Sequence, residues 1–257
     1  MKTAQTHTLG RFSRTLLAGA LLAGLSMPAL AEFDVAGNMS LVSDYRFRGV
    51  SQTYKLPAVQ GGIDLTHSSG LYVGTWASNV TEKLYPNGAA LEMDFYGGYK
   101  WAITDAFTLD LGGLYYYYPG SYYLNADGAK GNKPNNFELY AGLSWNWLSL
   151  KYSHNMTNFF GLEDSKNSNY IDLTASYPIM DKLTLVAHVG HQKVKNYSDL
   201  DYTDYKLGVV YDLSGWNLGA AFVGTNAKEE FYTIGEADGS TKAIAKNTVV
   251  LSVSKSF

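Results

Sequence analysis

The sequence predicts an all-β fold, a transmembrane up-and-down antiparallel β-barrel of twelve strands with short periplasmic turns and long extracellular loops. Three observations predict it. Apolar and polar residues alternate with a period of two along segment after segment, the connections between these segments alternate between short and long, and the polar side of the segments carries charged residues.

The N-terminus has the layout of a secretory signal peptide. Lys2, Arg11 and Arg14 precede the apolar run 16–25, and the Ala29-Leu30-Ala31 stretch that follows is a typical cleavage pattern. The alternative is an uncleaved anchor helix, but the apolar run is shorter than the about 20 residues that span a bilayer. We therefore expect a cleaved signal peptide at 1–31, a barrel at 32–257 and a destination beyond the inner membrane.

Composition excludes several classes of protein. The 257 residues are 46% hydrophobic and 17% charged, and they lack the sustained apolar bulk of a helical membrane bundle. The absence of cysteine excludes disulfides, thiolate nucleophiles and cysteine-built metal centres. A formal net charge of -3 provides no basic footprint, so no nucleic-acid partner is expected.

Period-two alternation marks each expected strand. The first is read as one long strand, with Val35, Leu41 and Phe47 on its apolar face and Asp34, Asp44 and Arg46 on its polar face. The complete set of expected strands is 34–48, 59–67, 71–80, 91–101, 107–118, 137–145, 147–155, 170–177, 183–192, 205–211, 216–226 and 247–257.

The lengths of the connections predict the topology of the barrel. Short turns are expected near 68–70, 102–105, 146, 178–182 and 212–215, and long loops at 51–58, 81–90, 119–136, 156–169, 193–204 and 227–246. Both termini of the barrel domain then lie on the side of the short turns, as in an up-and-down barrel with an even strand number. All five prolines beyond residue 31 are expected in connections: Pro57, Pro86, Pro119, Pro134 and Pro178.

The charged residues decide which way the apolar face points. A soluble barrel would have to bury these charges in a narrow dry core, which is costly, so we expect the apolar face to contact lipid. Two aromatic girdles are predicted accordingly. The girdle beside the short turns is Trp101, Trp145, Trp147, Tyr177, Tyr211 and Trp216, and the one toward the long loops is Tyr45, Phe47, Tyr115, Tyr117 and Phe222.

The last strand ends in an alternating apolar set that closes with the terminal Phe257. This ending looks like the C-terminal signal by which outer-membrane barrels are recognised by their assembly machinery. Lys255 stands where an apolar or aromatic residue is usual. It either extends to the lipid headgroups or weakens the signal.

Three segments resemble a known family: Ser-Asp-Tyr-Arg-Phe-Arg-Gly-Val-Ser-Gln at 43–52, Pro-Ala-Val-Gln-Gly-Gly-Ile-Asp at 57–64 and Gly-Leu-Tyr-Val-Gly-Thr-Trp-Ala-Ser-Asn-Val at 70–80. Together they are similar to the TorF family of putative porins, most sharply over 33–80. The resemblance implies a Gram-negative outer-membrane protein of porin type. It implies no substrate and no catalytic residues, because many members are known only as conserved proteins of unknown function.

The inward face carries more acids than bases, which predicts a modest cation preference for a charged pore. Filling of the lumen by charge pairs is an equally weighted alternative. Arg46 and Arg48 either form a basic ladder for an anionic solute or pair locally with Asp44. The expected pore-lining residues are Asp44, Arg46, Arg48, Asp64, Glu92, Asp94, Lys100, Asp110, Glu138, Lys151, Asp172 and Lys206.

Catalysis is the least favoured hypothesis. His154 and His191 are the candidates for a lipase-like site in the lipid-facing wall, but Ser153 and Asn155 point to the opposite face from His154 and so form no triad with it. No catalytic residue, metal or cofactor is expected.

The predicted function is a porin-like channel for passive diffusion of small hydrophilic solutes or ions, located in the cell outer membrane. The alternative is a closed barrel whose loops serve a structural, ligand-binding or partner-binding role. The expected partners are outer-membrane lipid, the barrel-assembly machinery and a small hydrophilic solute.

Overall fold

Twelve strands form one closed antiparallel barrel in the computed structural model, as the alternation predicted. The structure describes residues 33–257 except 86, 88 and 236–238. The predicted signal peptide lies outside the described residues. The barrel strands are β1 (Phe33–Val42), β4 (Ala58–His67), β5 (Leu71–Asn79), β6 (Leu91–Ala102), β7 (Phe107–Tyr117), β8 (Asn136–Trp145), β9 (Leu148–Asn155), β10 (Asn169–Met180), β11 (Leu183–Lys193), β12 (Tyr202–Leu213), β13 (Trp216–Thr225) and β16 (Thr248–Ser256).

The barrel closes where its last strand meets its first. β1 pairs with β4 from Phe33↔His67 onward and with β16 from Asn38↔Ser256 onward. The terminal residue takes part in the closure, because the backbones of Phe257 and Gly37 exchange two hydrogen bonds of 2.9 Å. No strand of the barrel is therefore left with an unpaired edge.

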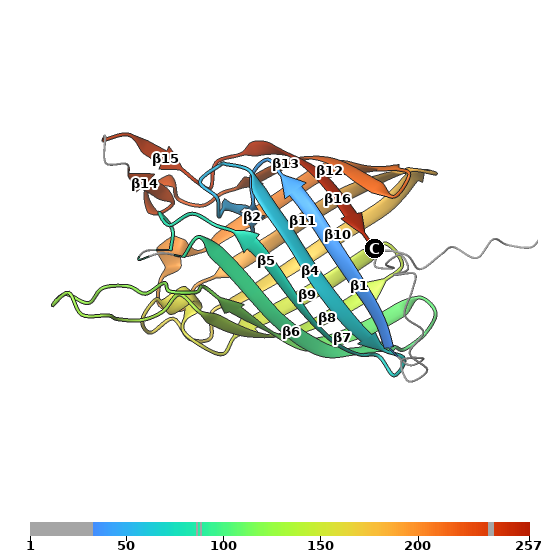
Figure 1. Cartoon of the computed structure of the whole chain (residues 1–257), viewed down its shortest axis with the longest axis horizontal. Coiled ribbons are helices and arrows are strands. Elements are labelled where there is room, and N and C mark those ends of the chain that lie inside the picture. The colour runs from blue at the N-terminus through green and yellow to red at the C-terminus, as the bar shows by residue number, and fades with distance from the viewer. Residues whose placement is uncertain (1–32, 86, 88, 236–238) are drawn as a thin grey trace, which may run out of the picture.

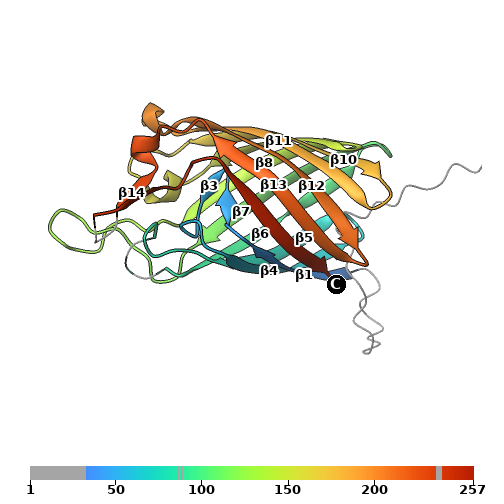
Figure 2. The ribbon, with the colours of Figure 1, turned by 90° about the horizontal axis from the view of Figure 1, so that it is seen from above.

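Long connections gather at one end of the barrel, and the C-terminus lies at the other (Figure 1). We call these the loop end and the turn end. The view from above shows the same arrangement (Figure 2). The loop end carries short extra elements: hairpins β2 (Arg46–Phe47)–β3 (Val50–Ser51) and β14 (Thr233–Gly235)–β15 (Thr241–Ala243), and 3-10 helices η1 (Phe159–Gly161), η2 (Ser198–Leu200) and η3 (Glu229–Phe231).

Burial is inverted relative to a soluble protein. Outward-facing Val59 and Leu207 are 66% and 57% exposed, whereas inward-facing Glu92 and Glu138 are each 1% exposed. An apolar exterior around a polar interior is the pattern of a barrel that spans lipid. No helix among the described residues has the length and apolarity needed to cross a membrane.

The girdle predicted at the turn end is present. All six of its aromatic residues are exposed, from Trp216 at 38% to Trp101 at 57%. Lys255 lies beside this girdle, with its Nζ 5.0 Å from the centre of the Trp216 ring. A lysine that covers an aromatic face while its ammonium group reaches the headgroup level is compatible with the membrane interface.

Two predictions about the strands were wrong. The first strand ends at Val42 and not at residue 48, so Tyr45 and Phe47 are inside the barrel and take no part in the girdle at the loop end. Pro178 lies within β10 and not in a turn, at the point where the register with β11 shifts. A bulge is one of the few places in a sheet that tolerate a residue without an N–H donor.

A bend at residues 43–44 ends the first strand, and a tight turn then reverses the chain. Arg48 and Gly49 both adopt positive φ, 47° and 80°, between the paired residues Phe47 and Val50. This is the two-residue turn of a type I′ hairpin, which reverses the chain. Residues 43–57, called here the lumen hairpin, therefore fold back into the barrel instead of extending its wall.

Candidate functional site in the barrel lumen

The lumen hairpin places three predicted pore-lining residues inside the barrel. Arg46 Nε donates to Asp44 Oδ2 at 2.6 Å, and both side chains are buried. Arg46 Nη1 donates to the carbonyl oxygens of Gly49, Ile244 and Lys246 at 2.9, 3.0 and 3.1 Å. Of the two readings offered for Arg46, the structure therefore shows local pairing with Asp44.

Arg48 fastens the tip of the hairpin to the opposite wall. Its Nη2 donates to both carboxylate oxygens of Glu138 in β8, at 2.9 and 2.8 Å, and its Nη1 donates to Gln192 Oε1 in β11 at 2.7 Å. The guanidinium carbon lies 4.7 Å from the centre of the Phe47 ring and 4.2 Å from that of Tyr170. Two wall strands accept hydrogen bonds from the guanidinium and two aromatic rings contact it, so Arg48 acts as a cross-link.

The charge state of Arg48 follows from this environment. Burial lowers its pKa, but the charge of Glu138 and the hydrogen bonds to it outweigh burial, so the pKa of Arg48 is raised above its ordinary value. Arg48 thus carries its charge at any pH the protein meets. Arg48 therefore brings a permanent positive charge to the cross-link.

Gly49 allows the tip to approach the wall this closely. A Cβ atom at this position would lie 2.5 Å from Thr225 Cγ2 and 2.8 Å from Asp204 Cβ. Its positive φ also favours glycine. The hairpin therefore reaches from β1 and β4 across to β12 and β13.

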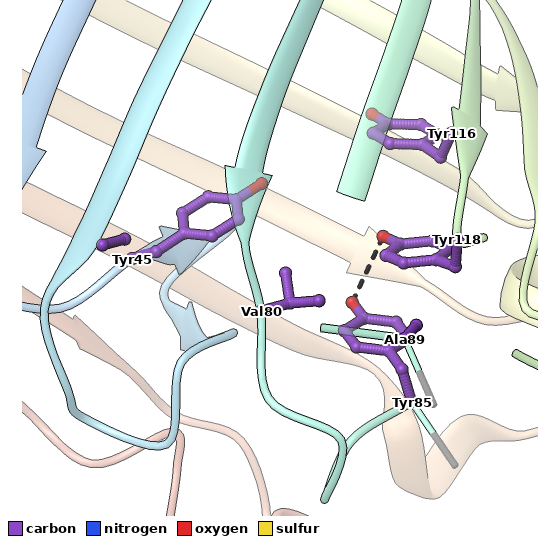
Figure 3. Packing of buried hydrophobic residues seen from close by; sticks show 7 residues of the cluster. Tyr45, Val80, Tyr85, Ala89, Tyr116 and Tyr118 are labelled. Carbon is purple, nitrogen blue, oxygen red and sulfur yellow. Dashed lines mark hydrogen bonds between the residues drawn. The ribbon is translucent and has the colours of Figure 1, made fainter. Parts of the chain in front are cut away.

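Tyrosine hydroxyls hold the acidic residues beside the hairpin. Glu92 accepts hydrogen bonds from Tyr45 at 2.7 Å and Tyr118 at 2.8 Å, and Tyr118 is stacked against Tyr85 (Figure 3). Burial raises the pKa of Tyr45, Tyr85 and Tyr118 well above the ordinary value, so these phenols stay neutral donors. Asp94 is also buried, and its Oδ1 has no hydrogen-bond partner among the described residues.

A cavity of ≈ 560 Å³ lies in the lumen toward the turn end, and we call it the tyrosine-lined cavity. Tyr72 donates to Asp110 at 2.6 Å and contacts the hydroxyl of Tyr140, and Tyr96 donates to Asp64 at 2.7 Å. Lys100 and Lys151 lie over the Tyr72 and Tyr140 rings, 4.9 and 3.9 Å from their centres. Five of the predicted residues thus line this one cavity: Asp64, Asp94, Lys100, Asp110 and Lys151.

A second cavity of ≈ 320 Å³ lies beside the lumen hairpin, and we call it the valine-lined cavity. Lys206 of β12 contributes to its wall. The nearby His188 ring lies 3.0 Å from Asp204 Oδ2 and 4.0 Å from Asp172 Oδ1. All twelve predicted residues are therefore in the lumen, but two cavities and the hairpin divide them.

Sequence reasoning missed the inward tyrosines, Gln192, His188 and Asp204. An inward aromatic residue next to an inward glycine of the neighbouring strand is a recognisable pattern that identifies such tyrosines. Tyr170 lies over Gly190 of the neighbouring strand, where a Cβ atom would be 2.0 Å from its hydroxyl. This arrangement lays the ring flat against the wall.

Gly190→Val is therefore expected to destabilise the barrel by about 1–3 kcal/mol, the usual range for overpacking. The displaced Tyr170 ring would lose its 2.8 Å hydrogen bond to Asp204 and its stacking on Arg48. Urea unfolding in lipid vesicles measures the effect. Gly142→Val is the control, because a Cβ atom there meets nothing closer than 3.8 Å, and equal losses for both variants would contradict the explanation.

The histidines proposed for a lipase-like site show no triad. His154 Nδ1 lies 3.2 Å from the Tyr152 hydroxyl and its Nε2 lies 3.2 Å from Asn167 Oδ1, while Ser153 and Asn155 are buried on the lumen side. His191 Nδ1 is 3.0 Å from Thr203 Oγ1. In the described part of the chain, no group of three His, Cys, Asp or Glu side chains is placed to hold a metal ion.

Comparison with known proteins identifies a family and a fold. A family model described as "Bacterial protein of unknown function (Gcw_chp)" matches residues 27–257. No curated protein matches the chain. The structure of the KdgM porin in complex with disordered oligogalacturonate is similar, with a TM-score of 0.51 at 9% identity over 87% of this chain and 98% of that one.

Two further solved structures are similar. A membrane protein from work on in-meso crystallization has a TM-score of 0.51 at 8% identity, over 87% of this chain and 83% of that one. The NanC porin has a TM-score of 0.47 at 11% identity, over 87% and 99%. At such identities the likeness to KdgM shows a shared fold.

Proposed function

Because the chain belongs to the family described as a bacterial protein of unknown function, Gcw_chp, which assigns no activity, we propose a function from the geometry of the lumen. The protein is a porin-like outer-membrane channel for passive diffusion of small hydrophilic solutes or ions. The observation that carries this proposal is the tyrosine-lined cavity, a polar space inside a closed barrel whose exterior is apolar. The fold shared with a porin supports it.

The mechanism follows from the groups that face the lumen. Lysines, carboxylates and phenols exchange hydrogen bonds with a solute and so replace part of its hydration shell, which lowers the barrier to crossing. The lumen hairpin narrows the loop end, because Arg48 ties it to β8 and β11. A narrow passage restricts the proposed channel to small solutes.

We also propose a modest cation preference. The Arg46–Asp44 and Arg48–Glu138 pairs cancel in the lumen. Among the described inward-facing residues this leaves more acids than lysines: Asp64, Glu92, Asp94, Asp110, Asp172 and Asp204 against Lys100, Lys151 and Lys206. An excess of fixed negative charge favours cations in a pore.

Single-channel recording in planar bilayers tests both proposals. We expect discrete conductance steps from the refolded protein. In a potassium chloride gradient, we expect a reversal potential with the sign that indicates selectivity for potassium over chloride. Asp64→Asn/Asp110→Asn should move that potential toward zero. Anion selectivity would contradict the proposed cation preference but not the proposed channel.

The alternative of a closed barrel with a binding or structural role is favoured by one observation, the hairpin that crosses the lumen. A correctly folded barrel that shows no conductance would overturn the channel and support this alternative. The heat-dependent shift in gel mobility of folded barrels identifies correct folding in that experiment.

We also propose that the chain belongs to the TorF family, that residues 1–31 are removed and that the protein resides in the outer membrane. We propose further that the assembly machinery recognises the strand that ends at Phe257. The exposed apolar wall and the paired C-terminal strand support the outer-membrane location.

A further inference from the structure

One side of the lumen is apolar, which a water-filled pore does not require. The wall of the valine-lined cavity includes Val42, Val186, Val210, Ala221, Val223 and Val250, contributed by β1, β11, β12, β13 and β16. Inward positions of outer-membrane barrels are ordinarily polar. This side of the lumen therefore has a chemistry of its own.

Two cationic groups border this apolar wall. The Arg46 side chain is 4% exposed, and three of its donors are accounted for above by Nε and Nη1, yet its buried Nη2 has no hydrogen-bond partner among the described residues. An unsatisfied buried donor costs free energy. Arg46 lines the valine-lined cavity, so a molecule bound there can supply the missing acceptor.

Lys206 is the second cation. It pairs with Val223 and His188 in the sheet register and lines the same cavity, and its Nζ forms no hydrogen bond or ion pair with any residue that the structure describes. The acids near Lys206 have other partners, including Asp172, which accepts from Thr174 at 3.4 Å. Asp204 accepts from Tyr170 at 2.8 Å, and Asp44 is bound by Arg46, Ser51 and Thr53.

We propose that the valine-lined cavity binds an amphipathic monocarboxylate, an aliphatic chain that ends in one carboxylate group. The valines would cover the chain, and the carboxylate would accept hydrogen bonds from Arg46 Nη2 and Lys206 Nζ. A carboxylate satisfies an arginine N–H and a lysine ammonium with charge-assisted bonds. The volume of ≈ 320 Å³ lies at the small end of the range for ligand pockets, about 300–1,000 Å³, and so favours a short chain.

This inference does not depend on conduction. The site needs only the folded barrel and the lumen hairpin that presents Arg46. A barrel without conductance would overturn the channel and leave this site to be tested separately.

Fluorescence titration with sodium octanoate tests the site. Trp76 lines both the valine-lined and the tyrosine-lined cavity, whereas the other four tryptophans belong to the exposed girdle at the turn end. Ala221→Leu, which fills only the valine-lined cavity, assigns the signal to one of the two. The refolded protein in lipid nanodiscs should show a saturable change that is absent from Trp76→Phe. Octanol and octylamine, with the same chain but no carboxylate, should give no saturable change, and neither should acetate.

Three variants give the decisive comparison. Lys206→Met should weaken octanoate binding by about tenfold or more, the expected effect of losing a hydrogen bond to a charged group. Ala221→Leu should abolish binding by filling the cavity. Lys100→Met is the matched control, because Lys100 lines the tyrosine-lined and not the valine-lined cavity, and it forms no ion pair with any residue that the structure describes. This variant should bind octanoate as the wild type does.

Several results would overturn the proposal. They are the absence of saturable binding, equal affinity for octanol and octanoate, unchanged binding in Ala221→Leu, or the same loss in Lys100→Met as in Lys206→Met. The octanol comparison uses the wild-type protein and Ala221→Leu keeps the charge of Lys206, so the proposal stays testable even if Lys206→Met fails to fold.

Discussion

Glu138→Gln is expected to release the lumen hairpin and to raise single-channel conductance several-fold above the wild-type level. The substitution leaves the Arg48 guanidinium buried without a counter-ion, because Glu138 is its ion-pair partner at 2.8 Å. Removing one partner of a buried ion pair costs about 3–5 kcal/mol. The hairpin can avoid that cost by moving Arg48 into water, and this movement widens the lumen. Planar-bilayer recording of both proteins measures the change.

The double variant Arg48→Met/Glu138→Leu is the control for this prediction. It removes both charges and leaves apolar side chains next to Phe47 and Tyr170, and such replacements of a buried ion pair are often neutral. The hairpin should then stay in place and conductance should remain near the wild-type level. Equal conductance of Glu138→Gln and the wild type would show that the hairpin is not the constriction, or that Arg48 does not hold it.

Leu173→Arg is expected to destabilise the barrel by about 2–4 kcal/mol, the cost of a basic side chain on the lipid face near the bilayer midplane. Leu173 is 40% exposed, lies near the middle of β10 and pairs with Leu150 and Val189 on the same outward face. The arginine would have to enter hydrocarbon or distort the bilayer to reach water. Urea unfolding in lipid vesicles, followed by the gel shift, measures the loss.

Ser176→Arg supplies the matched comparison on the same strand. Ser176 faces the lumen and pairs with Val186, so its replacement meets water and polar groups and should cost well under the lipid-facing variant. Similar losses for both variants would show that the outward face of β10 is not in contact with lipid.

Local pattern was enough to predict the wall of the barrel. Side chains alternate between the two faces of a strand, so period-two alternation defined the twelve strands, their short and long connections and the outward apolar face. The inward direction of residues such as Asp64, Lys100 and Asp110 followed from the same pattern. These features depend on neighbours in sequence or on adjacent strands, which a single sequence displays.

Alternation was misleading where the chain leaves the sheet. Residues 43–48 continue the period of two, yet the chain bends at 43–44, carries Tyr45 and Phe47 into the lumen and then reverses at Arg48–Gly49. The Arg-Gly pair is not one of the dipeptides that usually mark such a turn, such as Asn-Gly or Asp-Gly. The same periodicity therefore fits a wall strand and a hairpin inside the barrel.

The sequence by itself determined that this protein is a barrel with a lipid-facing exterior and a polar interior, because strand periodicity and charge are local properties. Only the tertiary structure decided how the interior is used. Arg48 meets Glu138 across 90 residues of chain, and the valine-lined cavity combines residues from seven strands and the hairpin. Contacts across a lumen depend on barrel closure and on how deeply a loop enters, and no spacing along the chain encodes either.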